Sequence, residues 1–281
     1  MIEVKKKTFS EIFLIYSDKR MIKILLLGAI SGFPWVLIGS SLSLWLKEDG
    51  LSRSTIGWAG LIFSVYAFNY LWAPLIDRVR IPFLTKKIGH RRSWIILMQG
   101  FILLSLILWS ILNPLENLGL VITIGLIIAI ASATQDITVD ALRIEQIGES
   151  EGESMAAGAA MAVVGWWTGY KIGGVLSLFS ADFLEEAGFE NYWQLTFLIL
   201  AILVIIMNIG LTFINEQNSS YRRNTQDEND KLISSKFKKI NFFTKFLSWI
   251  GGTISGPIIS FFKKNGFSIA MGFLGFVFLF K

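Results

Sequence analysis

The sequence LGLVITIGLIIAIA (Leu118–Ala131) runs directly into SATQDITVDA (Ser132–Ala141), and this junction decides what kind of protein the chain can be. The first part is apolar enough to lie in a bilayer, which a helix of about 20 such residues spans. The second part places Asp136 and Asp140 one helical turn apart. A carboxylate at membrane depth costs about 3 kcal/mol on insertion scales. Two of them indicate a proton relay, a solute pathway or a buried ion pair.

The composition agrees with a membrane protein. Hydrophobic residues make up 53% of the 281 residues, charged residues 17%, and the mean hydropathy is +0.57. The chain has no cysteine and one histidine, His90, so neither a thiol nor a histidine metal site is expected, and no cofactor is expected. The net charge of +5 comes from cations beside hydrophobic segments, which favours a lipid bilayer over nucleic acid as partner.

Six segments are long and apolar enough to span a membrane as helices. They are 21–46, 55–75, 93–112, 118–141, 156–181 and 192–214. Lysine and arginine gather before the first, between the second and third, and after the sixth, whereas the opposite loops hold only Lys47 and Arg53. By the positive-inside rule, the N-terminus is predicted to be cytoplasmic.

This order predicts an all-α membrane protein built as half of a twelve-helix transporter. Residues 1–20 form a cytoplasmic segment and residues 21–214 a six-helix bundle. Residues 215–265 form a cytoplasmic linker containing an interfacial amphipathic helix, with a simple charged tether as the alternative. Residues 266–281 begin a seventh helix too short to cross, so we expect a truncated transporter that requires a missing C-terminal half.

The acidic pair is the first candidate site. Asp136 and Asp140 lie on a small, polar face of the fourth predicted span, which should face a cavity or another helix rather than lipid. Because neighbouring carboxylates resist ionising together, the pair is predicted to carry protons. The alternative for Asp140 is a structural ion pair with Arg143, three residues later.

The fifth predicted span supplies a candidate solute site. Gly165, Gly169 and Gly173 recur every four residues and predict a close helix contact. Lys171 lies near mid-span, where facing lipid would be costly. The aromatic candidates beside it are Trp166, Trp167 and Tyr170. Aromatic rings stack on sugars and a lysine pairs with a carboxylate, so this combination suits a sugar-containing anion. The alternative for the aromatic residues and for Lys171 is a role in helix packing only.

The loop between the second and third spans resembles the cytoplasmic signature of the major facilitator superfamily. Asp77 and Arg78 end the second span, and Arg91 and Arg92 begin the third. Charge-assisted bonds among them would hold one conformation and break in another, as a gating latch. The alternative is that these cations only anchor the topology.

Several motifs together resemble one family within that superfamily. They are Gly28…Ser31-Gly32-Phe33-Pro34, Leu71-Trp72-Ala73-Pro74-Leu75-Ile76-Asp77-Arg78, Ala133-Thr134-Gln135-Asp136-Ile137-Thr138-Val139-Asp140-Ala141, and Gly158-Ala159-Ala160. Over most of residues 20–215 they resemble the muropeptide permeases of the AmpG type, whose distant relatives include acetyl-coenzyme-A transporters. The resemblance adds Gln135 and Asn69 to the solute-binding candidates. This chain departs from the family pattern at two places. The family often has lysine at the position of Asn69, and it often has Tyr-Arg at the position of Trp166-Trp167.

The resemblance implies proton-driven import of anhydro-muropeptides from periplasm to cytoplasm, through the bacterial inner membrane, for peptidoglycan recycling. The alternatives are transport of another anion, such as an acyl-coenzyme A or a sugar acid, and a half-transporter without activity of its own. A membrane enzyme is disfavoured because phosphate-loop, His-Glu-x-x-His and Gly-x-Ser-x-Gly motifs do not occur in the sequence.

Overall fold

The computed structural model describes residues 9–147, 152–216, 259 and 261–280, and within these ranges the regular structure is helical. The chain divides into two compact units. The first unit comprises Met1–Tyr66 and Pro82–Gln217, and the second comprises Ala67–Ile81 and Asn218–Lys281. The predicted all-helical fold is confirmed for the described residues.

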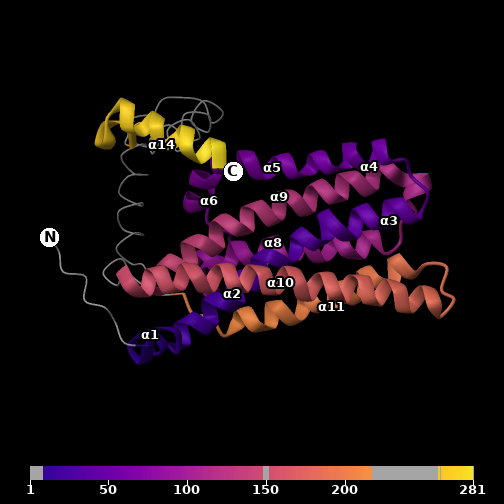
Figure 1. Ribbon diagram of the computed structural model, residues 1–281, viewed down its shortest axis with the longest axis horizontal. Coiled ribbons are helices and arrows are strands. Elements are labelled where there is room, and N and C mark those ends of the chain that lie inside the picture. Colours follow the sequence, from indigo (N-terminus) through magenta and orange to yellow (C-terminus); the bar gives the residue numbers. More distant parts are fainter. Residues whose placement is uncertain (1–8, 148–151, 217–258, 260, 281) are drawn as a thin grey trace. The chain divides into compact units, whose positions relative to one another are not determined.

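The first unit contains the long helices, which run side by side in Figure 1. Its elements are α1 (Phe9–Tyr16), α2 (Lys19–Val36), the π-helical η1 (Leu37–Ser41), α3 (Leu42–Glu48), α4 (Arg53–Ala59), η2 (Gly60–Ser64), α7 (Leu84–Ile88), α8 (His90–Trp109), α9 (Pro114–Ile147), α10 (Gly152–Glu186) and α11 (Tyr192–Thr212). The break between the two units falls within α5 (Val65–Phe68).

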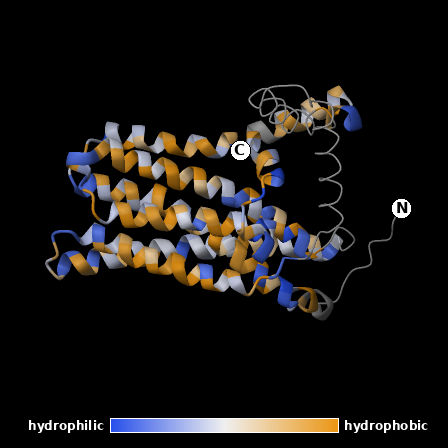
Figure 2. Cartoon of the chain, turned by 180° about the vertical axis from the view of Figure 1, so that it is seen from behind, coloured by the Kyte–Doolittle hydropathy of each residue, from blue (hydrophilic) through white to orange (hydrophobic). Residues whose placement is uncertain are grey.

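Four of the described helices are long and apolar enough to cross a membrane. They are Lys19–Glu48, which joins α2, η1 and α3, and then α8, α9 and α11. They match the first, third, fourth and sixth predicted spans. Hydrophobic residues occupy the middle of these helices and hydrophilic residues gather at their ends (Figure 2), as a bilayer requires. The fifth predicted span lies inside α10, an unbroken helix that is not among these four.

The second predicted span, 55–75, is not one regular α-helix. That region is divided among α4, η2, α5, η3 (Asn69–Leu71) and α6 (Ala73–Arg78). Phe68 and Trp72 have ψ angles of 0° and −1°, outside the regular α-helical range, and a proline enters the first turn of α6. A proline lacks a backbone donor and clashes with the preceding turn, so apolar composition alone overstated the continuity.

Glycines bring α2 and α10 into backbone contact, which confirms the predicted glycine face. A Cβ at Gly165 or Gly169 would collide with the carbonyl oxygens of Leu25 and Ala29. A Cβ at Gly32 of α2 would likewise meet the backbone of α10. The two helices therefore pack more closely than larger residues would allow, and this fixes the wall of the candidate site.

The second unit contains α6, η3 and α14 (Phe267–Phe280), in which Phe267–Phe276 forms a short apolar helix. Residues 217–258 and 260, which hold most of the predicted linker and its interfacial helix, lie outside the described residues.

Candidate functional site

A pocket of about 300 Å³ opens where α2, α9 and α10 meet, and it holds both predicted aspartates. Its lining residues are Gly28, Ser31, Asp136, Val139, Asp140, Arg143, Ala159, Ala162, Val163 and Trp166. The small residues make room for the pocket, while Asp136, Asp140 and Arg143 supply its charges. The polar face predicted for the fourth span therefore does border a cavity.

Asp136 accepts a short hydrogen bond inside this pocket. Its Oδ1 lies 2.5 Å from the Oγ of Ser31, whose side chain is buried. Ser31 comes from α2, so the bond joins two helices across the pocket. A hydroxyl can rotate and can either donate or accept, so this partner can serve Asp136 in both protonation states.

A buried tyrosine stands beside the same carboxylate. The hydroxyl of Tyr66 lies next to that of Ser132 and within electrostatic reach of Asp136. The Tyr66 side chain is only 8% exposed. Ser31 and Tyr66 thus place two side-chain hydroxyls near Asp136.

Aromatic rings continue from the pocket along α2 and α10. The ring of Trp35 lies 4.5 Å from that of Tyr66 and 5.7 Å from that of Trp166. Trp166 in turn stacks on Tyr170 at 5.5 Å. Trp166 also lines the pocket, so this cluster offers ring faces close to the acidic pair.

The two aspartates are unequal. Asp140 accepts a hydrogen bond from Arg143 at 3.2 Å, and its side chain is 67% exposed. This is the structural ion pair that the sequence offered as its alternative role. Asp136 instead bonds to the buried hydroxyl of Ser31 on the neighbouring helix.

Lys171 lies on the exposed side of α10, away from the buried glycines. Its Nζ stands 5.8 Å from the ring centre of Trp167 and 6.0 Å from that of Tyr170. Trp167 is 51% exposed. The cation and rings form the predicted combination, on a face next to the pocket rather than inside it.

Gln135 does not line the pocket. It is fully buried, accepts a hydrogen bond from Gln99 at 2.5 Å and donates one to the carbonyl oxygen of Ile30 at 2.9 Å. Asn208 extends this amide chain toward α11 with a contact of 3.4 Å to Gln99. We therefore assign Gln135 to joining α2, α8 and α9, in place of the predicted contact with solute.

Three other predicted residues belong to the second unit. Asn69 begins η3 and accepts a hydrogen bond from the backbone of Trp72, while Asp77 and Arg78 lie in the last turn of α6. Arg91 and Arg92 belong to the first unit. The proposed pairing across the loop, and solute contact by Asn69, stay predictions.

The start of α8 carries an arrangement that the sequence did not reveal, which we call the carboxylate cap. The carboxylate of Glu216 accepts hydrogen bonds from the backbone N–H groups of His90, Arg91 and Arg92 at 3.0, 2.9 and 3.2 Å. Helix starts leave such donors unsatisfied and favour negative charge. Gly89 has φ +98°, and a Cβ there would collide with Glu216. Glycine is therefore required both by the backbone conformation and by the approach of the carboxylate.

The two arginines of the predicted latch have partners at this end of the first unit. Arg91 is 8% exposed, and its Nε lies 3.4 Å from Glu145 near the end of α9. Arg92 donates to the carbonyl oxygen of Thr212 at 3.3 Å, at the end of α11. The cap and these contacts hold the start of α8 to the ends of α9 and α11.

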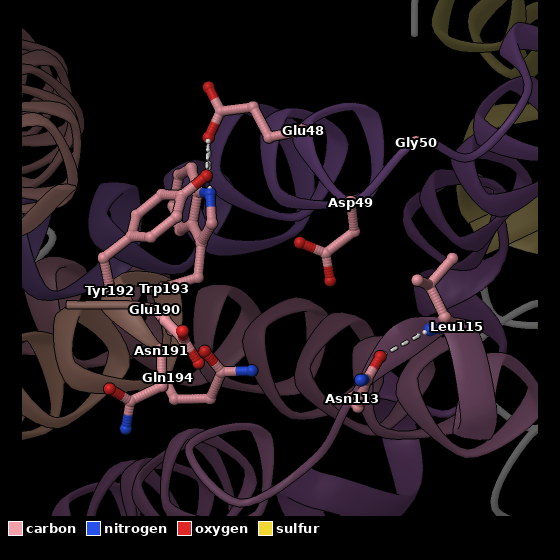
Figure 3. A pocket seen from close by; sticks show the side chains of 10 residues that line it. All are labelled: Glu48, Asp49, Gly50, Asn113, Leu115, Glu190, Asn191, Tyr192, Trp193 and Gln194. Carbon is pink, nitrogen blue, oxygen red and sulfur yellow. Dashed lines mark hydrogen bonds between the residues drawn. The ribbon is translucent and has the colours of Figure 1, made fainter. Parts of the chain in front are cut away.

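A separate cavity of about 430 Å³ lies at the opposite end of the first unit (Figure 3). There Glu48 accepts hydrogen bonds from the Trp193 indole at 2.6 Å and the Tyr192 hydroxyl at 3.1 Å. Burial, together with the neighbouring Glu48, raises the pKa of Asp49 above its ordinary value. Because Glu48 is tied to α11, we assign it to fastening α3 rather than to binding solute.

Long apolar helices around a pocket with ionisable groups define a multi-pass membrane protein with a polar site inside its helix bundle. The family model described as the Major Facilitator Superfamily matches residues 24–280. The chain therefore belongs to the major facilitator superfamily, a family of membrane transporters.

The curated relatives include proteins of the type that the motifs resemble. The chain is 35% identical to "Putative transporter AmpG 4" of Rickettsia felis over 251 residues, which are 89% of this chain and 54% of the relative. It is 31% identical to "Anhydromuropeptide permease" of Escherichia coli over 196 residues, 69% of this chain and 38% of the relative. The resemblance to AmpG-type proteins is thereby confirmed. The chain spans about half the length of the first of these relatives and less of the second.

The sequence reasoning missed Ser31, Tyr66 and Glu216. Ser31 stood in the motif Ser31-Gly32-Phe33-Pro34, so its place beside glycine on a spanning helix was a usable signal. Tyr66 likewise begins the run that leads into the motif Leu71–Arg78, whereas Glu216 had no such signal, because its partners lie far away in the chain. Within the described residues, no group of three or more histidine, aspartate or glutamate side chains is placed to hold a metal ion.

Proposed function

We propose that this protein takes part in proton-coupled import of anhydro-muropeptides from the periplasm to the cytoplasm, for peptidoglycan recycling. The observation that carries the proposal is Asp136 in its pocket, hydrogen-bonded to Ser31, in a chain similar to an anhydromuropeptide permease. We place the protein in the bacterial inner membrane with its N-terminus cytoplasmic, since its cations favour that side. Transport would require the other six helices of a twelve-helix transporter.

In this mechanism Asp136 holds the coupled proton. Protonation removes a charge from the pocket, and the Ser31 hydroxyl can turn to accept from the neutral acid. Release of the proton restores a carboxylate that prefers its donors and water. The two protonation states therefore differ in charge inside the pocket, and coupling to a proton gradient requires that this difference favour one conformation of the transporter over the other.

Trp166, Trp167, Tyr170 and Lys171 are the proposed solute contacts. The rings offer faces for sugars and Lys171 offers a cation for a carboxylate. Asp140 would assist through its ion pair with Arg143. The predicted latch of Asp77, Arg78, Arg91 and Arg92 would control access by breaking and reforming charge-assisted bonds.

Transport of another anion is the second candidate, because Lys171 lies where the resemblance puts no cation. Uptake into vesicles containing the full-length protein, driven by an imposed pH gradient, separates the two. Labelled anhydro-muropeptide should accumulate, whereas labelled acetyl-coenzyme A and glucuronate should not. Accumulation of either of these without anhydro-muropeptide would overturn the muropeptide assignment and leave the transporter class intact.

Lys171→Ala tests the solute contacts. It should weaken uptake of the anionic solute by roughly tenfold, the effect of losing one charge-assisted contact. Uptake of an analogue whose carboxylates are amidated should change little. Lys171→Arg, which keeps the charge, is the control. An equal loss for both solutes would assign Lys171 to packing.

A further inference from the structure

A groove of about 490 Å³ lies where α3, α4 and α10 meet, outside the site described above. Its lining residues are Ser40, Ser43, Leu44, Lys47, Leu51, Arg53, Ile56 and Leu178. Four apolar side chains line it, and two hydroxyls and two cations stand among them. We call it the outer cationic groove.

The two cations are unusual for this end of the chain. In the sequence, the loops on the side opposite to the N-terminus hold Lys47 and Arg53 as their only lysine and arginine. The same loops carry many acids: Glu48, Asp49, Glu116, Asp182, Glu185, Glu186 and Glu190. The fold nevertheless brings both cations to one groove.

Both charges are available to a ligand. Within the part of the chain that the structure describes, neither Lys47 nor Arg53 forms an ion pair with a carboxylate. The neighbouring acid Glu48 is instead bonded to α11 through Trp193. Lys47 and Arg53 are exposed, so an anion can approach them from water.

Exposed side chains continue from the groove along α10 toward the middle of that helix. Leu178 lines it, and Val175 and Lys171 follow on the same face at helical spacing, all of them exposed. Seven residues of helix correspond to about 10 Å. Lys171, whose Nζ stands by the ring of Trp167, therefore lies about 10 Å from Leu178 along α10, on a single exposed stripe.

We propose that the outer cationic groove binds a carboxylate group of the solute at the outer face, before the solute moves inward along α10 to Lys171. This rests on the proposed function only in taking the solute to be an organic anion. The two cations and the serine hydroxyls supply donors for a carboxylate, and the leucine and isoleucine side chains supply a surface for its carbon skeleton.

The groove suits a single anionic group better than an anionic lipid surface. A neighbouring hollow shares Leu44 and Leu178 with it and carries Glu48, Asp182 and Glu185. These acids repel an extended negative surface, while one carboxylate can be held between Lys47 and Arg53. The proposed ligand of the groove is therefore a dissolved solute and not a lipid surface.

The test uses a matched pair of sugars. N-acetylmuramic acid differs from N-acetylglucosamine by a lactyl group that carries a carboxylate, so the pair isolates the charge. Binding of each sugar to the full-length protein in nanodiscs is measured by ligand-detected NMR titration. N-acetylmuramic acid should bind more tightly than N-acetylglucosamine. Lys47→Gln/Arg53→Gln should weaken binding of the acid by roughly tenfold. Because the cations are exposed, raising the salt concentration should also weaken it.

Two further variants serve as controls. Lys86→Gln/Lys87→Gln makes the same charge change on α7 and should leave the preference unchanged. Lys47→Arg/Arg53→Lys keeps both charges and should retain binding, which separates charge from packing. Equal binding of the two sugars, an equal loss in the Lys86/Lys87 variant, or binding only of phosphatidylglycerol added to the nanodiscs would overturn the proposal. Carboxylate binding at the groove without muropeptide uptake would overturn the proposed function alone.

Discussion

Two carboxylates, Asp136 and Glu216, each accept hydrogen bonds from another part of the first unit, but the donors differ in kind. Glu216 accepts from three backbone N–H groups at the start of α8. Asp136 accepts from the hydroxyl of Ser31, with the hydroxyl of Tyr66 nearby. Backbone N–H groups can only donate, so the position of Glu216 calls for a fixed acceptor. Hydroxyls can reverse, so Asp136 can be served in either state.

The difference indicates separate roles for the two ends of the bundle. The carboxylate cap fastens α8, α9 and α11 where their ends meet, and it should contribute to stability rather than to proton movement. The Asp136 pocket opens to solvent through small residues and should contribute to transport rather than to stability. The predictions below test this division.

The largest expected effect is on transport. Asp136→Asn should reduce proton-driven uptake by at least about 100-fold, because removing the proton carrier of a coupled step removes the coupling. Its melting temperature and membrane insertion should be near those of the unchanged protein. Uptake under an imposed pH gradient is the measurement, with Glu216→Gln as the control, which should keep its uptake. Full uptake by Asp136→Asn would show that Asp136 and Glu216 do not differ in their importance for transport.

Gly89→Ala should give the largest loss of stability. The backbone there has φ +98° and ψ 167°, a region that only glycine adopts readily, and the new Cβ would displace Glu216. We expect a loss of about 2 kcal/mol in the free energy of unfolding. Gly100→Ala, on the same helix and facing open space, is the control. It should be neutral or stabilising by up to about 1 kcal/mol. Equal effects of both substitutions in thermal or denaturant unfolding would contradict the cap.

Glu216→Gln should have a smaller effect, because one acceptor oxygen remains while the charge at the helix start is lost. We expect a loss of about 1 kcal/mol. The double variant Gly89→Ala/Glu216→Gln should lose less unfolding free energy than the two single variants lose together, since both changes break the same contact. Strict additivity in unfolding measurements would show that Gly89 and Glu216 act separately.

The smallest effect concerns Asp49, a carboxylate that belongs to neither region. Burial and the charge of Glu48 raise its pKa, so the folded state holds its proton more tightly than the unfolded state does. Stability from this group should therefore fall as the pH rises from the ordinary value of 3.8 through the raised pKa. Asp49→Asn should flatten that decline in melting temperature. A steeper decline in the variant would contradict the assignment.

Asp18 provides the opposite case for the same measurement. Hydrogen bonds from Arg20 hold the pKa of Asp18 below its ordinary value. Stability from this group should be present above pH 3.8 and should be lost as the pH falls through the lowered pKa. Asp18→Asn should remove that loss at low pH, so the two variants should change the pH profile in opposite directions.

Hydrophobic length and charge placement were enough to predict most of the fold. Four predicted spans correspond to membrane-length apolar helices, and the glycine spacing of α10 predicted its contact with α2. The second span was predicted as continuous because composition does not register backbone breaks. Its interruptions at Phe68 and Trp72 depend on local backbone angles that an apolar count does not contain.

The site was predictable where its signal was local. Asp136, Asp140 and Arg143 share one helix face, and they do line one pocket. Gln135 was predicted from a motif, yet its side chain lies on another face and joins the buried amide chain. The cap could not be predicted, because Glu216 follows α11 and its donors begin α8, more than 120 residues earlier.

Proton flux on addition of solute tests the central claim most directly. Vesicles containing the full-length protein, in weakly buffered medium, should take up protons from outside when anhydro-muropeptide is added, and the external pH should rise. Asp136→Asn should abolish that rise while solute exchange at equal concentrations continues. Glu216→Gln should keep it. A proton signal that persists in Asp136→Asn, or that is lost in Glu216→Gln in a protein that still folds, would contradict the account.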